Sequence, residues 1–109
     1  MEIQQKDVNA SGIKFSIEKE GKEVAFGFLY LMYNVKERPF GLVEYIFVEE
    51  EYRGQKLGTQ IVEAIIAAAK EHNCYKLIAT SRFSRPHVHE WYQKLGFEDY
   101  GKEFRMNLS

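Results

Sequence analysis

The stretch from Val43 to Lys70 limits the fold most, because it carries a strand signal, a loop signal and a helix signal in succession. Residues 42–48 are rich in β-branched and aromatic types, which predicts a strand. Residues 57–71 repeat apolar side chains at the spacing of one helix face. These side chains are Leu57, Ile61, Val62, Ile65, Ile66, Ala68 and Ala69. The chain must therefore place a strand directly before an amphipathic helix, as α/β domains do.

The loop between this strand and this helix is short, basic and free of acidic residues. It contains Arg53, Gly54, Lys56 and Gly58. The first N–H groups of a helix have no intrahelical partner, so a loop of this kind at a helix start can bind an anion. Glycines let the backbone approach the ligand closely. The alternative is an ordinary strand-to-helix turn with a solvated arginine and lysine.

The rest of the chain predicts one mixed sheet with two main helices. Alternating side chains from Ile13, a turn at Gly21 and a long apolar stretch predict a hairpin, and Gly27 suggests a bulge or a close backbone approach. Pro86 and Gly96 are suited to the start and end of a second helix. The predicted strands are 13–18, 23–33, 41–48, 75–80, 97–100 and 103–108, and the helices are 57–71 and 86–95. The order is βββαβαββ in a single α/β domain over residues 1–109, mostly antiparallel, with 75–80 parallel to 42–48.

Composition excludes several classes of protein. The chain has 109 residues, 45% hydrophobic and 15% aromatic, which is typical of a globular domain. A net charge of −1 argues against a general nucleic-acid or membrane-surface binder. The apolar run 24–33 is too short to span a bilayer, and the first residues lack the layout of a signal peptide. The single cysteine, Cys74, permits no intrachain disulfide and is interpreted as a packing residue at a helix end. We expect a cytoplasmic protein.

The segment Val48 to Gly58 resembles the acetyl-CoA-binding motif of the GNAT acetyltransferase superfamily, Gln/Arg-x-x-Gly-x-Gly/Ala. Arg53 and Gly58 match it, and Lys56 stands where the first glycine usually lies; it can still offer its backbone N–H if its φ is negative. The resemblance implies a GNAT-like fold and acetyl-CoA with its pyrophosphate in this loop. The residues implied in binding are Ile46, Phe47, Val48, Arg53, Gly54, Gln55, Lys56, Leu57, Gly58, Thr59, Arg85 and Tyr92.

A second segment, His89 to Phe97, resembles the closing GNAT motif Phe-Tyr-x-Lys-x-Gly-Phe, with Trp91 in place of the phenylalanine. The resemblance implies that Tyr92 lies beside the sulfur of coenzyme A, where its phenol can protonate the leaving thiolate. The alternative is a helical tyrosine that only packs. Arg85 stands where the family often has an asparagine that touches the pantetheine arm, and Val88-His89 is similar to an Ala-His variant.

Together the two motifs predict an N-acetyltransferase that moves an acetyl group from acetyl-CoA to a primary amine by direct attack, without a metal. A backbone N–H near Ile46 to Val48 would polarise the carbonyl group. Glu44 is the first candidate base, because simple alternation places Glu44, Ile46 and Val48 on one strand face, and it would act through a water. His87 and His89 are alternative bases; at i, i+2 they do not form a helical metal pair.

Three other interpretations stay open at this point. The chain could bind acyl-CoA without turnover, as a GNAT-like module. A nucleotide-phosphate binder would use the same loop, but the chain lacks a Walker sequence. A homodimer could complete an acceptor cleft that is poorly walled, since the final strands would leave an open edge. The run Glu49 to Glu51 is interpreted as a solvated loop that could also attract a cationic acceptor. The sequence does not identify the acceptor.

Overall fold

The computed structural model describes residues 1–34, 38–80 and 86–108. It divides into two compact units, Met1–Ala79 and Thr80–Ser109, and each is described by itself. The single domain over residues 1–109 stays a prediction. No helix among the described residues is long and apolar enough to cross a membrane.

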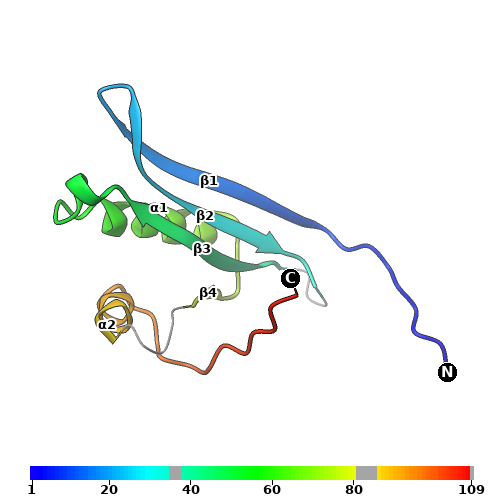
Figure 1. Ribbon diagram of the computed structural model, residues 1–109. Helices are drawn as coiled ribbons and strands as arrows, with labels where there is room; N and C mark the ends of the chain where they lie inside the picture. The colour runs from blue at the N-terminus through cyan, green and yellow to red at the C-terminus, as the bar shows by residue number, and fades with distance from the viewer. Residues whose placement is uncertain (35–37, 81–85, 109) are drawn as a thin grey trace. The chain divides into compact units, whose positions relative to one another are not determined.

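The first unit is a four-stranded sheet with one long helix (Figure 1). Strand order is β1-β2-β3-β4, with β1 and β2 antiparallel, β2 and β3 antiparallel, and β3 and β4 parallel. The strands are β1 (Ala10–Lys19), β2 (Lys22–Met32), β3 (Phe40–Val48) and β4 (Leu77–Ala79). The predicted mixed sheet is confirmed, and β4 is shorter than the predicted 75–80.

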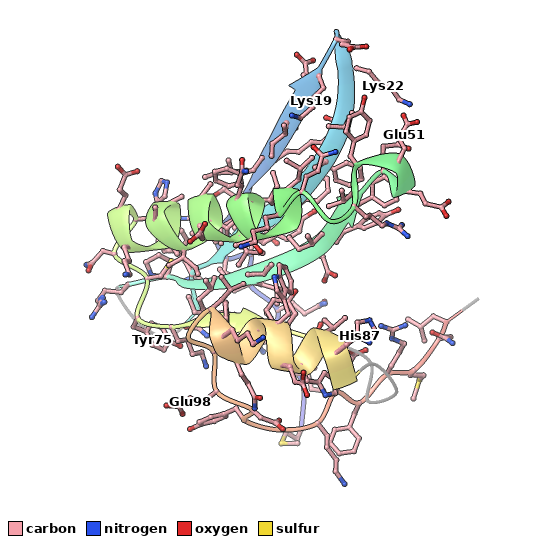
Figure 2. All side chains as sticks on the ribbon, turned by 90° about the vertical axis from the view of Figure 1, so that its left-hand side faces the viewer. Lys19, Lys22, Glu51, Tyr75, His87 and Glu98 are labelled. Carbon is pink, nitrogen blue, oxygen red and sulfur yellow. The ribbon has the colours of Figure 1, made fainter. Side chains whose placement is uncertain are left out.

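The hairpin between β1 and β2 closes through a two-residue turn. Lys19 pairs with Lys22, and both side chains lie at the tip of the hairpin (Figure 2). The turn residues Glu20 and Gly21 have φ of 54° and 77°. Two positive φ angles define the type I′ turn, whose twist matches that of antiparallel strands. The predicted turn at this position is confirmed.

Helix α1 (Leu57–Glu71) covers one face of the sheet (Figure 1). Its apolar stripe is buried as the 3.6-residue period predicts. The fully or nearly fully buried side chains of this core are Val24, Ala25, Leu29, Leu31, Val43, Leu57, Ile61, Val62, Ile65 and Ala69. Residues 25, 29 and 31 of β2 share one parity, so this parity faces α1. The other parity, with Phe26, Phe28 and Tyr30, defines the far face of the sheet.

The C-terminal end of α1 is closed by backbone and side-chain donors. Asn73 takes a left-handed φ of 61°, and the Cys74 N–H donates to the Ala69 carbonyl at 3.0 Å, as in a Schellman motif. The Arg38 guanidinium donates to the carbonyls of Asn73 and Cys74, at 2.9 and 3.1 Å. Burial raises the pKa of the Cys74 thiol, and the Arg38 charge opposes this. A raised pKa disfavours the thiolate, so Cys74 is a poor nucleophile.

The second unit contains α2 (Pro86–Lys94) and the segment after it. The predicted strands 97–100 and 103–108 are wrong: the structure describes these residues without strand pairing. Several of their large side chains are exposed, namely Tyr100, Phe104, Met106 and Leu108. Alternation of side chains indicates a face that could be buried, but a strand also needs a neighbouring backbone to accept its hydrogen bonds.

Candidate functional site

The loop before α1 has the features of an anion-binding helix start. Lys56 is the N-cap residue of α1, no side chain caps the helix, and its first turn holds no acidic residue. Gly54 takes a φ of 89° with no heavy atom within 4 Å of the place of a Cβ. Arg53, Gly54, Gln55 and Lys56 are all exposed. Helix-start N–H groups, which have no acceptor within the helix, beside exposed cations fit a phosphate or diphosphate group.

The backbone of Lys56 and the side chain of Arg53 define the geometry of this loop further. Lys56 has a φ of 63°, so the condition under which it could still offer its backbone N–H, a negative φ, is not met. The chain enters α1 through a left-handed N-cap, which is a conformation that glycine adopts without a Cβ penalty and lysine does not. The Arg53 Nε donates to the Val48 carbonyl at 3.1 Å. This bond ties the loop to the end of β3 and leaves the rest of the guanidinium for a ligand.

Between β3 and this loop lies a single turn of 3₁₀ helix, η1 (Glu50–Tyr52). Its acidic side chains are exposed, and Figure 2 shows Glu51 on this turn. Within the predicted solvated loop Glu49 to Glu51, Glu50 and Glu51 therefore form a short helix and are exposed, while Glu49 precedes it half-buried. The Glu49 N–H donates to the Val24 carbonyl at 2.8 Å, which holds the chain to β2 beyond the end of β3.

A bulge in β3 rearranges the residues that alternation had placed together. Phe28 pairs with Glu44 and Phe26 pairs with Phe47, so β3 has one more residue than β2 in this interval. The extra residue is accommodated at Tyr45, whose φ is 54°. Gly27 lies opposite the bulge, which confirms the bulge that this glycine suggested and gives its location.

The bulge separates Glu44 from the two residues expected beside it. Glu44 pairs with Phe28, so its side chain lies on the far face. Val48 pairs with Ala25 on the face that α1 covers. Ile46 also points toward α1, because a Cβ on Gly27 would meet its Cδ1 together with the side chain of Ile61. The predicted common face of Glu44, Ile46 and Val48 is therefore wrong.

Tyr45 and Phe47 join Glu44 on the far face. The Tyr45 ring meets the Phe26 ring edge-on at 5.4 Å between centroids, and the Phe47 ring lies 5.3 Å from the Phe26 ring. Tyr45 is 65% exposed and Glu44 is exposed too. Sequence reasoning missed Tyr45, because it assumed unbroken alternation along β3. The signal that could have found it was Gly27, once its bulge was assigned to the neighbouring strand.

In the second unit, Tyr92 occupies a well-defined helix end. The N–H groups of Gly96 and Phe97 donate to the carbonyls of Gln93 and Tyr92 at 3.0 and 3.1 Å. With Gly96 at a φ of 103°, this is a Schellman motif, and the predicted stop at Gly96 is confirmed. The Tyr92 ring meets the rings of Phe97 and Trp91 at 5.3 and 4.9 Å between centroids. These rings set the direction of the phenol within its own unit.

The other predicted residues are distributed between the two units. Leu57 is buried in the core, and Gly58 and Thr59 form the first turn of α1 with partial exposure. His87 is exposed at the start of α2 (Figure 2), and His89 follows in the same helix. Arg85 lies outside the described residues. Over the described ranges, no group of three or more His, Cys, Asp or Glu side chains could hold a metal ion.

Comparison with known proteins places this geometry in a family. The model of the acetyltransferase (GNAT) family matches residues 2–97. The chain belongs to the GNAT acetyltransferase family. Its mixed sheet with two helices is the GNAT-like fold of its structural neighbours. A putative acetyltransferase from Agrobacterium tumefaciens superposes with a TM-score of 0.82 at 28% identity, over 89% of this chain and 69% of that chain.

Two curated relatives share the family and carry more specific names. A glucosamine 6-phosphate N-acetyltransferase of Trypanosoma brucei brucei is 32% identical over 72 residues, which is 65% of this chain and 46% of that protein. A probable glucosamine 6-phosphate N-acetyltransferase 2 of Oryza sativa subsp. japonica is 36% identical over 61 residues, or 56% of this chain and 35% of that protein. The matched regions span less than half the length of these curated relatives.

Proposed function

We propose that this GNAT family protein is an N-acetyltransferase that moves the acetyl group of acetyl-CoA to a primary amine by direct attack. The observation that carries the proposal is the continuous unit of bulged β3, basic loop and uncapped α1. It presents a carboxylate and a helix-start anion site on one short piece of chain. The curated relatives are named for glucosamine 6-phosphate. An amino sugar phosphate is therefore the first acceptor to test.

The proposal gives each candidate site residue a role in binding or in catalysis. The first-turn N–H groups of α1, with Arg53 and Lys56, bind the diphosphate of acetyl-CoA. A backbone N–H in the segment Ile46 to Val48 donates to the thioester carbonyl. Gly54, Gln55, Leu57, Gly58 and Thr59 supply the close backbone approach around the diphosphate. Arg85 stays a predicted contact of the pantetheine arm.

The proton balance assigns Glu44 and Tyr92 to opposite ends of the reaction. Glu44 takes a proton from the acceptor ammonium, through a water, and leaves a neutral amine. The amine nitrogen forms a bond to the acetyl carbon while the bond from that carbon to sulfur breaks. The nitrogen then releases its second proton to solvent, and Glu44 returns the first to solvent. Tyr92 gives its phenolic proton to the sulfur, and solvent returns a proton to the phenolate. The net products are an amide, coenzyme A and one proton.

Release of free thiol from acetyl-CoA in the presence of amines tests the proposal. The panel contains glucosamine 6-phosphate, a peptide with a free N-terminus and a peptide with an internal lysine; glucose 6-phosphate, which has no amine, is the control. We expect thiol release with at least one amine and none with the control. Acetyl-CoA binding without release across amines of all three kinds would favour the acyl-CoA-binding module instead.

Tyr92→Phe separates the catalytic task of Tyr92 from its packing. The ring and its contacts with Trp91 and Phe97 are kept, and only the hydroxyl is lost. General acid catalysis contributes about 10²–10⁴-fold, so we expect kcat to fall by that order with little change in the Kd of acetyl-CoA. An unchanged kcat would show that water protonates the thiolate. The homodimer also stays a prediction, and light scattering at assay concentrations tests it.

A further inference from the structure

The β3 bulge has a second consequence, which concerns recognition of the acceptor. In a regular strand, successive side chains point to opposite faces. Glu44 and Tyr45 are successive residues, yet both lie on the far face, since Glu44 pairs with Phe28 and the Tyr45 ring contacts Phe26. A carboxylate and an exposed aromatic ring are thereby side by side on one surface.

The fold itself gives little reason for a tyrosine at this position. A φ of 54° is unfavourable for a residue with a bulky side chain, at a cost of about 1–2 kcal/mol. Tyr45 is 65% exposed, so burial of its ring recovers only part of this cost. Backbone strain of this kind gathers at functional sites, and the observed outlier therefore motivates a functional hypothesis.

The same face already holds a primary ammonium, that of Lys14. Its Nζ lies 4.9 Å from the centroid of the Phe26 ring and 2.9 Å from a carboxylate oxygen of Glu23. The group is thus bound by one aromatic ring and one carboxylate, through cation–π and charge–charge attraction. Lys14 and Glu44 flank Phe28 in a single row across three strands. Together the charges of Lys14, Glu23 and Glu44 leave one negative charge on this part of the face.

We propose that Tyr45 is a specificity-determining residue that, with Glu44, binds the acceptor as a primary alkylammonium ion on the far face of the sheet. Tyr45 and Glu44 would bind the ligand ammonium by cation–π and charge–charge attraction, as Phe26 and Glu23 bind the ammonium of Lys14. This inference rests on the proposed function, because the bound ammonium is the species that Glu44 would then deprotonate. It adds a criterion for acceptors: the amine must be charged before it reacts, and uncharged isosteres must bind more weakly.

The experiment measures binding without turnover, so that it is independent of acetyl transfer. The probes are n-butylammonium and n-butanol, which have similar size and differ in charge. Each is titrated into the full chain, and the backbone amide shifts of Glu44 and Tyr45 are followed by NMR. The amides of Glu50 and Glu51 serve as an internal reference for non-specific attraction to exposed carboxylates.

We expect n-butylammonium to saturate the shifts of Glu44 and Tyr45 at lower concentration than those of Glu50 and Glu51, and n-butanol to shift none of them. Tyr45→Asn should weaken the Kd of n-butylammonium about two- to fivefold, as expected for an exposed cation–π contact. Asparagine tolerates positive φ, so this variant should fold. Tyr45→Phe keeps the ring and should bind as the natural chain does. Glu44→Gln should abolish the preference for the charged probe.

Two outcomes overturn the inference. One is a titration in which the four amides respond alike, or respond equally to n-butanol; the other is an unchanged Kd in Tyr45→Asn. Failure of the proposed function is recognised separately. If n-butylammonium binds as expected but no amine releases thiol, the ammonium site stands and the transfer reaction does not. If thiol is released but n-butylammonium binds to Tyr45→Asn as it does to the natural chain, the transfer reaction stands and only the specificity role of Tyr45 is lost.

Discussion

The two halves of β3 differ in their register with β2, in their pairing with β4 and in their exposure. The first half, Phe40–Val43, keeps regular register with β2 and pairs with β4 at Gly41, Leu42 and Val43. The second half, Glu44–Val48, contains the bulge and has no β4 partner within the described residues. Val43 is buried against α1, whereas Glu44 and Tyr45 are exposed. The contrast fits the proposal that the first half maintains the fold while the second half takes part in the reaction.

The largest effect that would test this contrast is expected from Glu44→Gln. The substitution keeps shape and removes the base, so kcat should fall by about 10²–10⁴-fold, the usual range for general base catalysis. The melting temperature should hardly move, because the residue is exposed. Glu63→Gln on the exposed side of α1 is the matched control and should leave both quantities unchanged. A fully active Glu44→Gln enzyme would remove the chemical role of this half of β3.

The neighbouring residue should give the opposite result. Val43 is 3% exposed and belongs to the α1 core. Val43→Ala removes two buried methyl groups and leaves a cavity, so the free energy of unfolding should fall by about 2–3 kcal/mol. Chemical denaturation measures this, and kcat at a temperature where the variant is folded should change little. A large loss of kcat with full stability would show that the two halves of β3 are not separate in function.

Gly27→Ala tests the place where the two halves meet. A Cβ there would overlap Ile46 and lie 2.8 Å from Ile61 Cγ2. Overpacking of this kind costs about 1–3 kcal/mol, and relief requires Ile46 to move with the bulged segment. We therefore expect lower stability and lower kcat together. Gly12→Ala on β1 is the control for overpacking alone, since the nearest atoms to its Cβ, at 2.9 Å, belong to the Tyr30 ring of β2 and not to β3. A variant with lost stability but normal kcat would show that the bulge does not depend on Gly27.

Features that depend on local signals could be predicted from the sequence. The β1–β2 turn, the span of α1 and the stop at Gly96 follow from turn residues and helical period, and two short motifs indicated the family. The bulge could not be placed, because alternation alone does not say which strand takes the extra residue. Residues 103–108 alternate as a strand does, but alternation supplies no partner backbone. The left-handed φ of Lys56 was missed because its residue type disfavours it.

The smallest effect is expected at Lys56, the second left-handed non-glycine residue of the segment from Glu44 to the start of α1. Phe40–Val43 contains no such residue, so between the start of β3 and α1 the left-handed residues lie only in the part assigned to chemistry; Glu20 and Asn73, elsewhere in the chain, belong to a hairpin turn and a helix end. Lys56→Gly relieves the Cβ penalty of about 1–2 kcal/mol, partly offset by the entropy that glycine loses on folding, and should raise stability by up to about 1 kcal/mol. The Kd of acetyl-CoA should rise only modestly, since one exposed charge is lost while the helix N–H groups remain. Lys56→Gln, which removes the charge and keeps the strain, separates the two effects in paired denaturation and calorimetric titrations. If Lys56→Gly is less stable than the natural chain, the left-handed N-cap is not strained. Backbone strain then no longer distinguishes the segment from Glu44 to α1 from Phe40–Val43.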